Sequence, residues 1–146
     1  MTFSIGGRSP GPELRTRTID ENVSYVAAVR DVRSTVNRWL RDMRRLGSLV
    51  VEGRDIGTAV FPEAHHKFYL DASPEERARR RHAEITGQEG SPDRGQVQQA
   101  LQKRDSIDSS RKADPLRVAS GAVILDTTAM GIAEVTRTIL ERVKHA

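Results

Sequence analysis

Apolar residues recur at every third or fourth position through residues 19–46, and this spacing predicts helix. The apolar positions are Val29, Val32, Val36, Trp39, Leu40, Met43 and Leu46. The remaining face carries Arg30, Arg33, Arg38, Arg41, Arg44 and Arg45. A break near residues 29–31 would divide the segment, so the pattern allows one long helix or two shorter ones.

Short apolar runs predict three β-strands, at residues 48–51, 67–71 and 122–125. Two further helices are predicted downstream, a polar one at residues 95–110 and an amphipathic one with apolar positions from Ile132 to Val143. Strands that alternate with helices predict an α/β fold with a parallel sheet. Three strands make a thin sheet, because parallel strands usually have neighbours on each side.

Several start signals agree for a helix that follows the second strand. Ser73 can cap the first turn, Pro74 suits the first helical position, and Glu76 completes a capping box. The helix is expected to end at Gly87, since glycine is the common residue after a helix.

The composition limits the classes of protein that fit. The 146 residues fit one domain. No apolar run approaches the roughly 18–20 residues of a membrane-spanning helix, and no basic stretch before an apolar run marks a signal peptide. The absence of cysteine excludes disulfides and thiolate metal sites. We therefore expect a cytoplasmic protein without a membrane partner.

Arginine strongly outnumbers lysine, with 20 arginines against 4 lysines and a formal net charge of +4. Because the guanidinium fork grips phosphate with two bonds, the skew suggests a partner that carries phosphate: a nucleotide, a nucleic acid or a phosphometabolite. High-GC codon usage would produce the same skew without any function. Aromatic residues make up only 4%, which weighs against stacking on single-stranded bases.

Residues 53–58 read Gly-Arg-Asp-Ile-Gly-Thr and follow directly after the first predicted strand. Ligands of open α/β sheets bind beyond the carboxyl ends of the strands, and glycines allow tight turns and close approach. Arg54 beside Asp55 could hold a phosphate and a base amine together. The alternative is a strand-to-turn connection with a local ion pair.

Arginines at helical spacing form another candidate for phosphate binding. Arg77, Arg80 and Arg81 are three and four positions apart, which predicts a compact cationic patch on one helix face. The alternative is a solvated face on which Glu75 and Glu76 pair with arginines of the same helix.

The polar helix carries a third candidate in Arg104, Asp105, Asp108 and Arg111, of which Arg104, Asp108 and Arg111 again lie at spacings of four and three. An acid between two arginines could order both side chains or bind a ribose hydroxyl. The alternative is a ladder of salt bridges within the helix.

The motifs together resemble those of the bacterial cytidylate kinases. The segments that carry the likeness are, in order, LRT, VVEGRDIGTAVFPEA, KFYLDASPEERARRR, KRDSIDSSRKADPL and VILDTT. The resemblance implies an incomplete P-loop NTPase-like fold of the nucleoside monophosphate kinase type, with three parallel strands, flanking helices, and the first strand and P-loop missing. Residues 1–46 would be the rest of the monophosphate-binding insertion with the long helix, and residues 47–146 the α/β core with a lid at about residues 74–94.

The resemblance further implies transfer of the γ-phosphoryl group of ATP to CMP or dCMP, with Mg²⁺ accompanying ATP and no tightly bound cofactor. Ser24, Arg33 and Asp55 match the cytosine-reading positions of the family. Asp55 could accept from the exocyclic amine of cytosine, the pairing that carboxylates use on that base in DNA.

Other matches concern the phosphates and the sugar. Arg54 and Arg104 match positions that hold the CMP phosphate, and Arg15 matches a further arginine of the monophosphate-binding insertion. Asp108 matches the contact with the sugar hydroxyls, and Arg111 lies at a position near the phosphates of both nucleotides. The expected catalytic group, which would stabilise charge on the transferring phosphoryl, is Arg77, Arg80, Arg81 and Arg111.

Two features do not match an entire kinase or a metal site. No GxxxxGK[ST] stretch occurs, so the sequence shows no P-loop, and His65 and His66 have no nearby acid, so we predict no metal site. We expect no useful kinase activity from this chain alone, and either a separate amino-terminal half or self-association through exposed sheet edges. The alternative is a non-enzymatic arginine-rich module that binds CMP, RNA or another phosphorylated partner.

Overall fold

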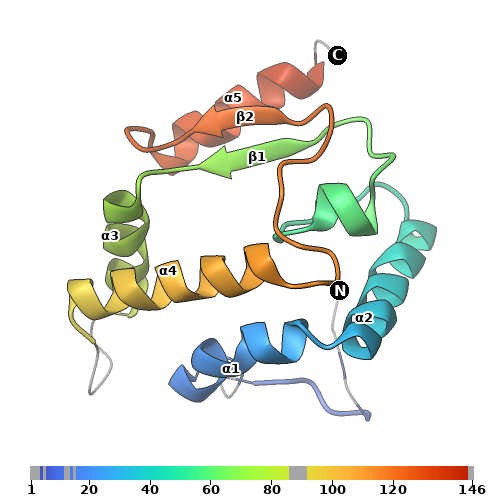
Figure 1. Ribbon diagram of the computed structural model, residues 1–146. Coiled ribbons are helices and arrows are strands. Elements are labelled where there is room, and N and C mark those ends of the chain that lie inside the picture. Colours follow the sequence, from blue (N-terminus) through green and yellow to red (C-terminus); the bar gives the residue numbers. More distant parts are fainter. Residues whose placement is uncertain (1–3, 5, 12–13, 15, 86–91, 145–146) are drawn as a thin grey trace.

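The computed structural model describes residues 4, 6–11, 14, 16–85 and 92–144 (Figure 1). In chain order its elements are α1 (Arg17–Ala27), α2 (Arg30–Asp42), η2 (Met43–Leu46), η3 (Ile56–Val60), β1 (Phe68–Asp71), α3 (Pro74–Ile85), α4 (Arg94–Ser110), β2 (Val123–Asp126) and α5 (Ile132–Lys144). Of these, η2 is a short 3-10 helix and η3 is a single π-helical turn.

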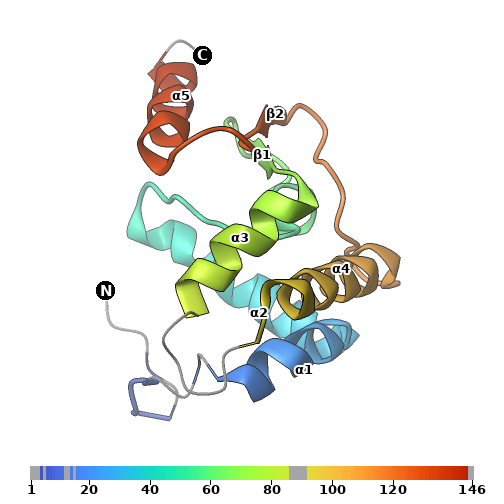
Figure 2. The same ribbon diagram turned by 90° about the vertical axis from the view of Figure 1, so that its left-hand side faces the viewer.

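The two strands and α5 lie toward one end of the molecule, and the other helices lie toward the opposite end (Figures 1 and 2). Helices α3 and α4 pack against each other, and α1 packs against α4. Helix α2 contacts α1 on one side and η3 on the other. This arrangement brings α2, η3 and α4 around one region of the protein, although they are far apart in the sequence.

The described sheet has two strands, where the apolar runs predict three. Strands β1 and β2 pair in parallel, with Phe68 opposite Val123 and Asp71 opposite Asp126. The prediction of a strand at residues 48–51 is wrong: this stretch is irregular, no ladder bond joins it to β1 or β2, and Val50 is fully exposed. An apolar run becomes a strand only where a neighbouring strand pairs with its backbone, and the sequence pattern does not report that neighbour.

The long amphipathic segment forms two helices with a break at residues 28–29. Val29 has an extended backbone (φ −75°, ψ 119°), and its carbonyl accepts from the N–H of Arg33 as α2 begins. The two-helix alternative is therefore correct. The change of direction matters for the site, because it places the first turns of α2 close to the end of α1.

The predicted start of α3 is half right. The N–H of Glu76 donates to Oγ of Ser73 at 3.1 Å, which is the expected cap. The reciprocal bond of a capping box is absent, since the N–H of Ser73 donates instead to Oγ1 of Thr128 at 2.9 Å. The carboxylate of Glu76 accepts from arginines one turn further on. The predicted end at Gly87 lies outside the described residues.

Helix α4 matches its prediction and begins one residue earlier than expected. Asp93 caps it through Oδ1, which accepts from the N–H of Gln96 at 2.9 Å. The Gln96 side chain accepts in turn from the N–H of Asp93, so this helix has the complete capping box.

The described interior is small and unusually polar. Its buried apolar residues are Val60, Ala72, Ala78 and Val97. Its buried polar residues are Ser24, Arg33, Asn37, Asp108, Arg111 and Thr127. Burying charge is expensive unless the group is paired and hydrogen-bonded, so these residues indicate an organised polar network.

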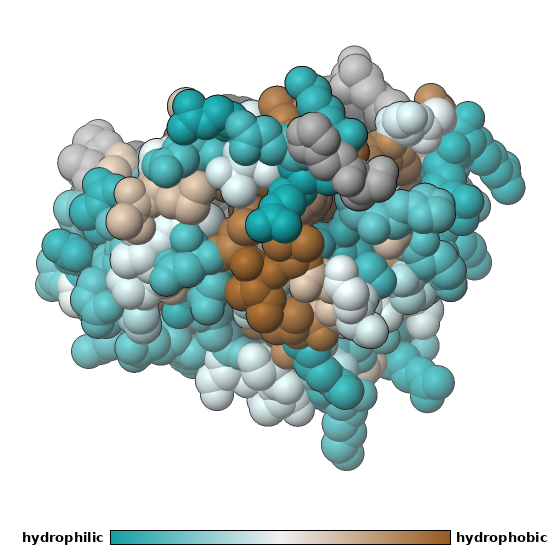
Figure 3. Space-filling view, turned by 90° about the horizontal axis from the view of Figure 1, so that it is seen from above, coloured by the Kyte–Doolittle hydropathy of each residue, from teal (hydrophilic) through white to brown (hydrophobic). Residues whose placement is uncertain are grey.

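Apolar side chains also reach the surface. Figure 3 shows apolar surface near the centre of the face seen from above, the side on which β1, β2 and α5 lie in Figure 1. Exposed apolar residues of these elements are Leu70, Ile124, Ile132, Leu140 and Val143. None of the helices in the described part of the chain has the length and apolar character needed to cross a membrane.

Candidate nucleotide-binding site

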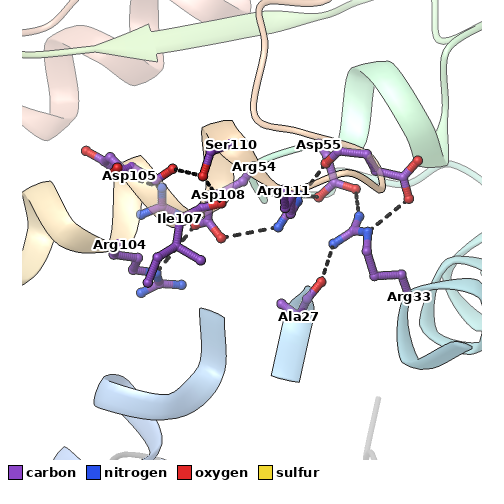
Figure 4. A network of polar contacts seen from close by, with 12 residues as sticks. Ala27, Arg33, Arg54, Asp55, Arg104, Asp105, Ile107, Asp108, Ser110 and Arg111 are labelled. Atoms are coloured by element: carbon purple, nitrogen blue, oxygen red, sulfur yellow. Dashed lines mark hydrogen bonds and ion pairs between the residues drawn. The ribbon is translucent and has the colours of Figure 1, made fainter. Parts of the chain in front are cut away.

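A buried pair of opposite charges lies between α2 and the residue before η3. Nη2 of Arg33 donates to Oδ2 of Asp55, and Nε of Arg33 donates to Oδ2 of Asp114 at 2.9 Å (Figure 4). Nη1 of Arg33 donates to the carbonyl of Ala27 at 3.3 Å. The structure thus brings two of the three predicted cytosine-reading residues, Arg33 and Asp55, into direct contact.

The turn that carries Asp55 is held against α2 by a second arginine. Arg41, two turns after Arg33, donates from Nε to the carbonyl of Val60 at 3.1 Å and from Nη2 to that of Ala59 at 2.5 Å. These carbonyls lie at the end of the π-helical turn, a conformation that often occurs at functional sites. Arg33 and Arg41 therefore fix both ends of the Asp55 segment.

Gly57 is required in this turn by close packing. A Cβ at this position would lie 3.0 Å from Cβ of Ala119 and 3.3 Å from the side chain of Lys67. The glycine thus allows η3 to approach its neighbours. It was expected to allow approach of a ligand, and in this structure the close neighbours are protein atoms.

Arg111 joins the Arg33–Asp55 pair to α4. Its Nη1 donates to Oδ1 of Asp108 at 3.2 Å, and its Nη2 lies 3.4 Å from Oδ1 of Asp55. Its Nε donates to the carbonyl of Asp114 at 2.7 Å. The guanidinium is almost wholly buried among these groups. A single arginine at the end of α4 therefore contacts both predicted subsites.

The residues predicted to hold phosphate and sugar lie around the middle of α4. Nε of Arg54 lies 3.1 Å from Oδ2 of Asp108, and its Nη1 donates to Oδ1 of Asp105 at 2.6 Å. Nε of Arg104 lies 3.9 Å from the same Oδ2 of Asp108. The prediction that Arg104, Asp108 and Arg111 share a helix face is confirmed, with Asp108 between the two arginines.

The pKa shifts describe a cationic environment. Burial tends to raise the pKa of Asp105, yet hydrogen bonds from Arg77 and Arg54 outweigh it, so the pKa lies below its ordinary value. The pKa of Arg104 is lowered, first by burial and then by the charge of Arg54. Burial and the neighbouring cation thus outweigh the opposing charge of Asp108 at Arg104.

The three arginines of the predicted patch on α3 diverge, so the prediction of a compact patch is wrong. Arg77 donates to Oδ2 of Asp105 and joins the network, whereas Arg81 contacts Asp20 of α1 and Glu84 of its own helix. Arg80 turns toward the loop after β2, where it donates to the carbonyls of Thr127 at 2.5 Å and Met130 at 3.3 Å. Each guanidinium donates to a different acceptor, and helical spacing alone does not predict which acceptor it will be.

The alternative reading of α3, in which glutamates pair with arginines of the same helix, is correct in part. Glu76 pairs with Arg79 and Arg80 at 2.7 Å, as expected for a surface ladder. Hydrogen bonds from Arg79 and then from Arg80 lower the pKa of Glu76 from 4.5 to about 2.

Four buried polar atoms of the network have no hydrogen-bond partner among the described residues: Nε of Arg77, Nε of Arg104, Nη2 of Arg111 and Oδ2 of Asp108. Arg111 and Asp108 lie within ion-pair distance of other charges but without hydrogen-bond geometry. Three of the four atoms are donors. Since buried polar groups are normally satisfied, the site suits a ligand rich in acceptors that also offers a hydroxyl to Asp108.

Of the predicted residues that the structure describes, Ser24 is not part of this network. Ser24 is buried in α1, one turn before Ala27, and the Arg33 contact with Ala27 brings that turn close to the site. Arg15 lies outside the described residues, as do residues 86–91 of the predicted lid.

Two residues of the network were not predicted: Asn37 and Asp114. Asn37 lies one turn after Arg33 on α2, and its buried amide donates to Oδ2 of Asp114 at 3.2 Å. Arg33 and Asn37 lie four residues apart, so both fall on one face of the predicted helix, and this spacing was the available signal for Asn37. Asp114 lies within the matched segment KRDSIDSSRKADPL, but its contact with Arg33 joins residues 81 positions apart, which the local pattern does not indicate.

No three His, Cys, Asp or Glu residues of the described chain cluster in a way that could hold a metal ion. Asp55, Asp105, Asp108 and Asp114 are each paired with arginine.

Open space adjoins the network. A hollow of about 410 Å³ is lined in part by Asp114, Thr58 and Ala59, and Oγ1 of Thr58 donates to the carbonyl of Asp55. Lys112 and Arg117 also line this hollow, which gives it two more cationic side chains.

Comparison with known proteins agrees with this chemistry. The family model for cytidylate kinase matches residues 2–145. The chain is 44% identical over 132 residues to "Cytidylate kinase" of Shouchella clausii (90% of this chain, 59% of the relative), and 41% identical over 144 residues to that of Mycobacterium leprae (98% and 65%). The protein of Oleidesulfovibrio alaskensis with the same name is 40% identical over 142 residues, covering 97% of this chain and 65% of the relative.

The chain belongs to the cytidylate kinase family. It spans about three fifths of the length of these curated relatives.

Proposed function

We propose that the protein provides the CMP-binding part of an enzyme that transfers a phosphoryl group from ATP to CMP or dCMP. The observation that carries the proposal is the donor-rich cluster of Arg77, Arg104 and Arg111, whose buried nitrogens lack acceptors next to a paired Arg33 and Asp55. A nucleoside monophosphate supplies both an acceptor-rich phosphate and a base with matching polar edges.

Cytosine would be recognised by Arg33 and Asp55. Oδ1 of Asp55 accepts no hydrogen bond from the described residues, so it can accept from the exocyclic amine of cytosine. Arg33 can donate to the ring nitrogen and the carbonyl of the base. Uracil has an oxygen in place of the amine, which would face the Asp55 carboxylate without a proton between them. Ser24 is proposed as a further contact with the base.

The phosphate of CMP would lie among Arg54, Arg104 and Arg77. The buried Nε of Arg104 has no acceptor among the described residues. Asp108 has one buried oxygen without a donor, which suits a hydroxyl of the sugar. Arg15, which lies outside the described residues, is proposed as an additional phosphate contact.

In the reaction, an oxygen of the CMP phosphate would attack the γ-phosphorus of ATP, and the bond from that phosphorus to the β–γ bridging oxygen would break. The products are CDP and ADP. Mg²⁺ would accompany ATP and neutralise part of its charge. Arg77, Arg81 and Arg111 would stabilise charge on the transferring group, since positioning and electrostatics dominate phosphoryl transfer. Arg80 would join them only after leaving its contacts with Thr127 and Met130.

We further propose that residues 1–146 do not turn over without a phosphate-binding loop supplied by additional sequence, because the GxxxxGK[ST] motif is not among them. Incubation with ATP, Mg²⁺ and CMP is expected to give no CDP above background. Robust CDP formation by this chain would contradict this part of the proposal. The substrates suggest the cytoplasm as the place of the reaction.

The binding proposal is tested by titrating the chain with CMP, dCMP, UMP and AMP in a calorimeter. Saturable binding of CMP or dCMP that exceeds binding of the other nucleotides is expected. The proposal fails if no nucleotide binds, or if the chain binds RNA with a steep salt dependence and shows no preference for CMP.

A further inference from the structure

We infer that Asp114 and Asn37 are positioning residues for base selection, an inference that rests on the CMP-binding function proposed above. Neither residue would need to touch the nucleotide. Oδ2 of Asp114 accepts from Nε of Arg33 at 2.9 Å and from Nδ2 of Asn37 at 3.2 Å. The two residues would act on the base through Arg33.

The argument begins with the hydrogen-bond capacity of Arg33. An arginine side chain carries five N–H donors in a planar fork. In Arg33 the Nε donor goes to Asp114, one Nη2 donor to Asp55, and one Nη1 donor to the carbonyl of Ala27. One N–H on each Nη atom then remains for a ligand. Two adjacent donors match the ring nitrogen and carbonyl of cytosine, whereas the N–H of uracil at that ring position would oppose one of them.

Which donors remain depends on the contact at Nε. Because the fork is rigid, an acceptor at Nε fixes the plane and the rotation of the whole guanidinium. Without Asp114, Arg33 could turn its Nε edge toward Asp55 and present a different set of donors. Asp114 therefore determines the donor pattern at the base, and Asp55 alone does not.

Asn37 has the corresponding role for Asp114. It is 7% exposed, so its amide needs a partner, and Asp114 is the acceptor of its Nδ2. Arg33 and Asn37 lie four residues apart on α2, and both donate to the same carboxylate oxygen. The helix thus holds the Asp114 carboxylate from two adjacent turns.

The backbone at Asp114 supports a role beyond packing. Its φ is +47°, the only positive value at a residue other than glycine among those described. Such conformations are uncommon and concentrate at functional sites, where surrounding contacts maintain them. Here Nε of Arg111 donates to the Asp114 carbonyl at 2.7 Å, and the N–H of Leu116 donates to the Asp108 carbonyl at 2.8 Å. Two contacts from the end of α4 therefore hold the loop.

The test measures base selection in the full 146-residue chain. Asp114→Asn keeps the size of the side chain and tolerates the positive φ, but it removes the charge opposite Nε. The expected result is a roughly tenfold loss of CMP affinity with UMP affinity little changed, so the ratio of the two dissociation constants falls. Asp42→Asn is the matched control, because Asp42 lies on the same helix as Arg33 and Asn37, is exposed, and among the described residues pairs with Arg45 at 3.9 Å.

A second pair of variants separates positioning from folding. Asn37→Ser leaves the Arg33–Asp114 pair intact and should reduce the CMP to UMP ratio by a smaller factor. Asn37→Asp combined with Asp114→Asn returns a carboxylate and an amide to the cluster and should recover part of the ratio. Far-ultraviolet circular dichroism identifies any variant that has lost its fold, and Asn37→Ser then carries the test.

Equal losses of CMP and UMP affinity in all variants would make Asp114 and Asn37 structural residues and overturn the inference. The inference would also be overturned if the ratio of the CMP and UMP dissociation constants stayed unchanged in all variants without any loss of affinity. The proposed function would still stand in that case if the wild type prefers CMP. A wild-type chain that binds CMP and UMP equally would refute the proposed function together with the inference.

Discussion

Nη2 of Arg111 lies 3.4 Å from Oδ1 of Asp55 and has no hydrogen-bond partner of its own. The residue that follows α4 thus reaches the residue that precedes η3. Through Asp108 on one side and Asp55 on the other, Arg111 links the proposed phosphate and base subsites. A ligand that spans both subsites would meet one continuous network.

A substitution of Arg104 should affect binding of the CMP phosphate without affecting binding of the base. Replacing it by glutamine in Arg104→Gln removes a cation whose Nε lacks an acceptor. We expect CMP affinity to fall roughly tenfold, the scale of one charge-assisted hydrogen bond, and cytidine affinity to remain unchanged. Calorimetric titration with both ligands measures this. Arg45→Gln is the control, because Arg45 is highly exposed. Equal losses for CMP and cytidine would contradict the assignment.

Asp105 should stabilise the fold by joining Arg54 to Arg77. The variant Asp105→Asn leaves two arginines, one from the turn before η3 and one from α3, without their shared anion. Because Asp105 is partly buried, a loss of about 1–3 kcal/mol in unfolding free energy is expected. Urea denaturation at neutral pH measures it, with Asp42→Asn expected to change stability by less than about 0.5 kcal/mol. A variant as stable as the wild type would show that solvent or other residues replace this carboxylate.

Arg80 should matter for stability more than for CMP binding. Its guanidinium joins α3 to the loop after β2 through the carbonyls of Thr127 and Met130. We expect Arg80→Gln to lower the unfolding free energy by about 1 kcal/mol and to leave the dissociation constant of CMP unchanged. A thermal melt and a CMP titration of the same sample test both parts. A large loss of CMP affinity at unchanged stability would return Arg80 to the phosphate site.

Acid should weaken the fold through Glu76. Its pKa is lowered from 4.5 to about 2 by hydrogen bonds from Arg79 and Arg80. A group with a depressed pKa in the folded state stabilises that state above its unfolded pKa, and the contribution is lost as the pH falls toward the folded pKa. Stability should therefore decrease between pH 4.5 and about 2, and less steeply in Glu76→Gln. Denaturation midpoints across this range measure the slope, and identical slopes would refute the contribution.

Several elements could be predicted because their signals are local. The complete capping box at the start of α4 is formed by residues 93 and 96, and the Ser73 cap of α3 also lies within one turn. The arginines and aspartate of α4 follow from helical spacing. Arg33 and Asp55 were identified from the family resemblance, because nothing in the local pattern joins two residues 22 positions apart.

The predictions that were wrong or absent concern contacts between residues far apart in the sequence. The stretch at residues 48–51 has the composition of a strand, but pairing depends on a neighbour elsewhere in the chain. Arg80 is not part of the predicted patch because its guanidinium donates instead to the carbonyls of residues 127 and 130. Asp114 meets Arg33 across 81 positions and with a backbone conformation that the sequence does not reveal.

The central claim is that the paired Arg33 and Asp55 distinguish cytosine from uracil. Calorimetric titration of the wild-type chain and of Asp55→Asn with CMP and with UMP tests it most directly. We predict that the wild type favours CMP by roughly tenfold or more, as one buried polar mismatch would require, and that Asp55→Asn loses this preference. Equal affinities in the wild type, or a preference that survives the substitution, would contradict the claim.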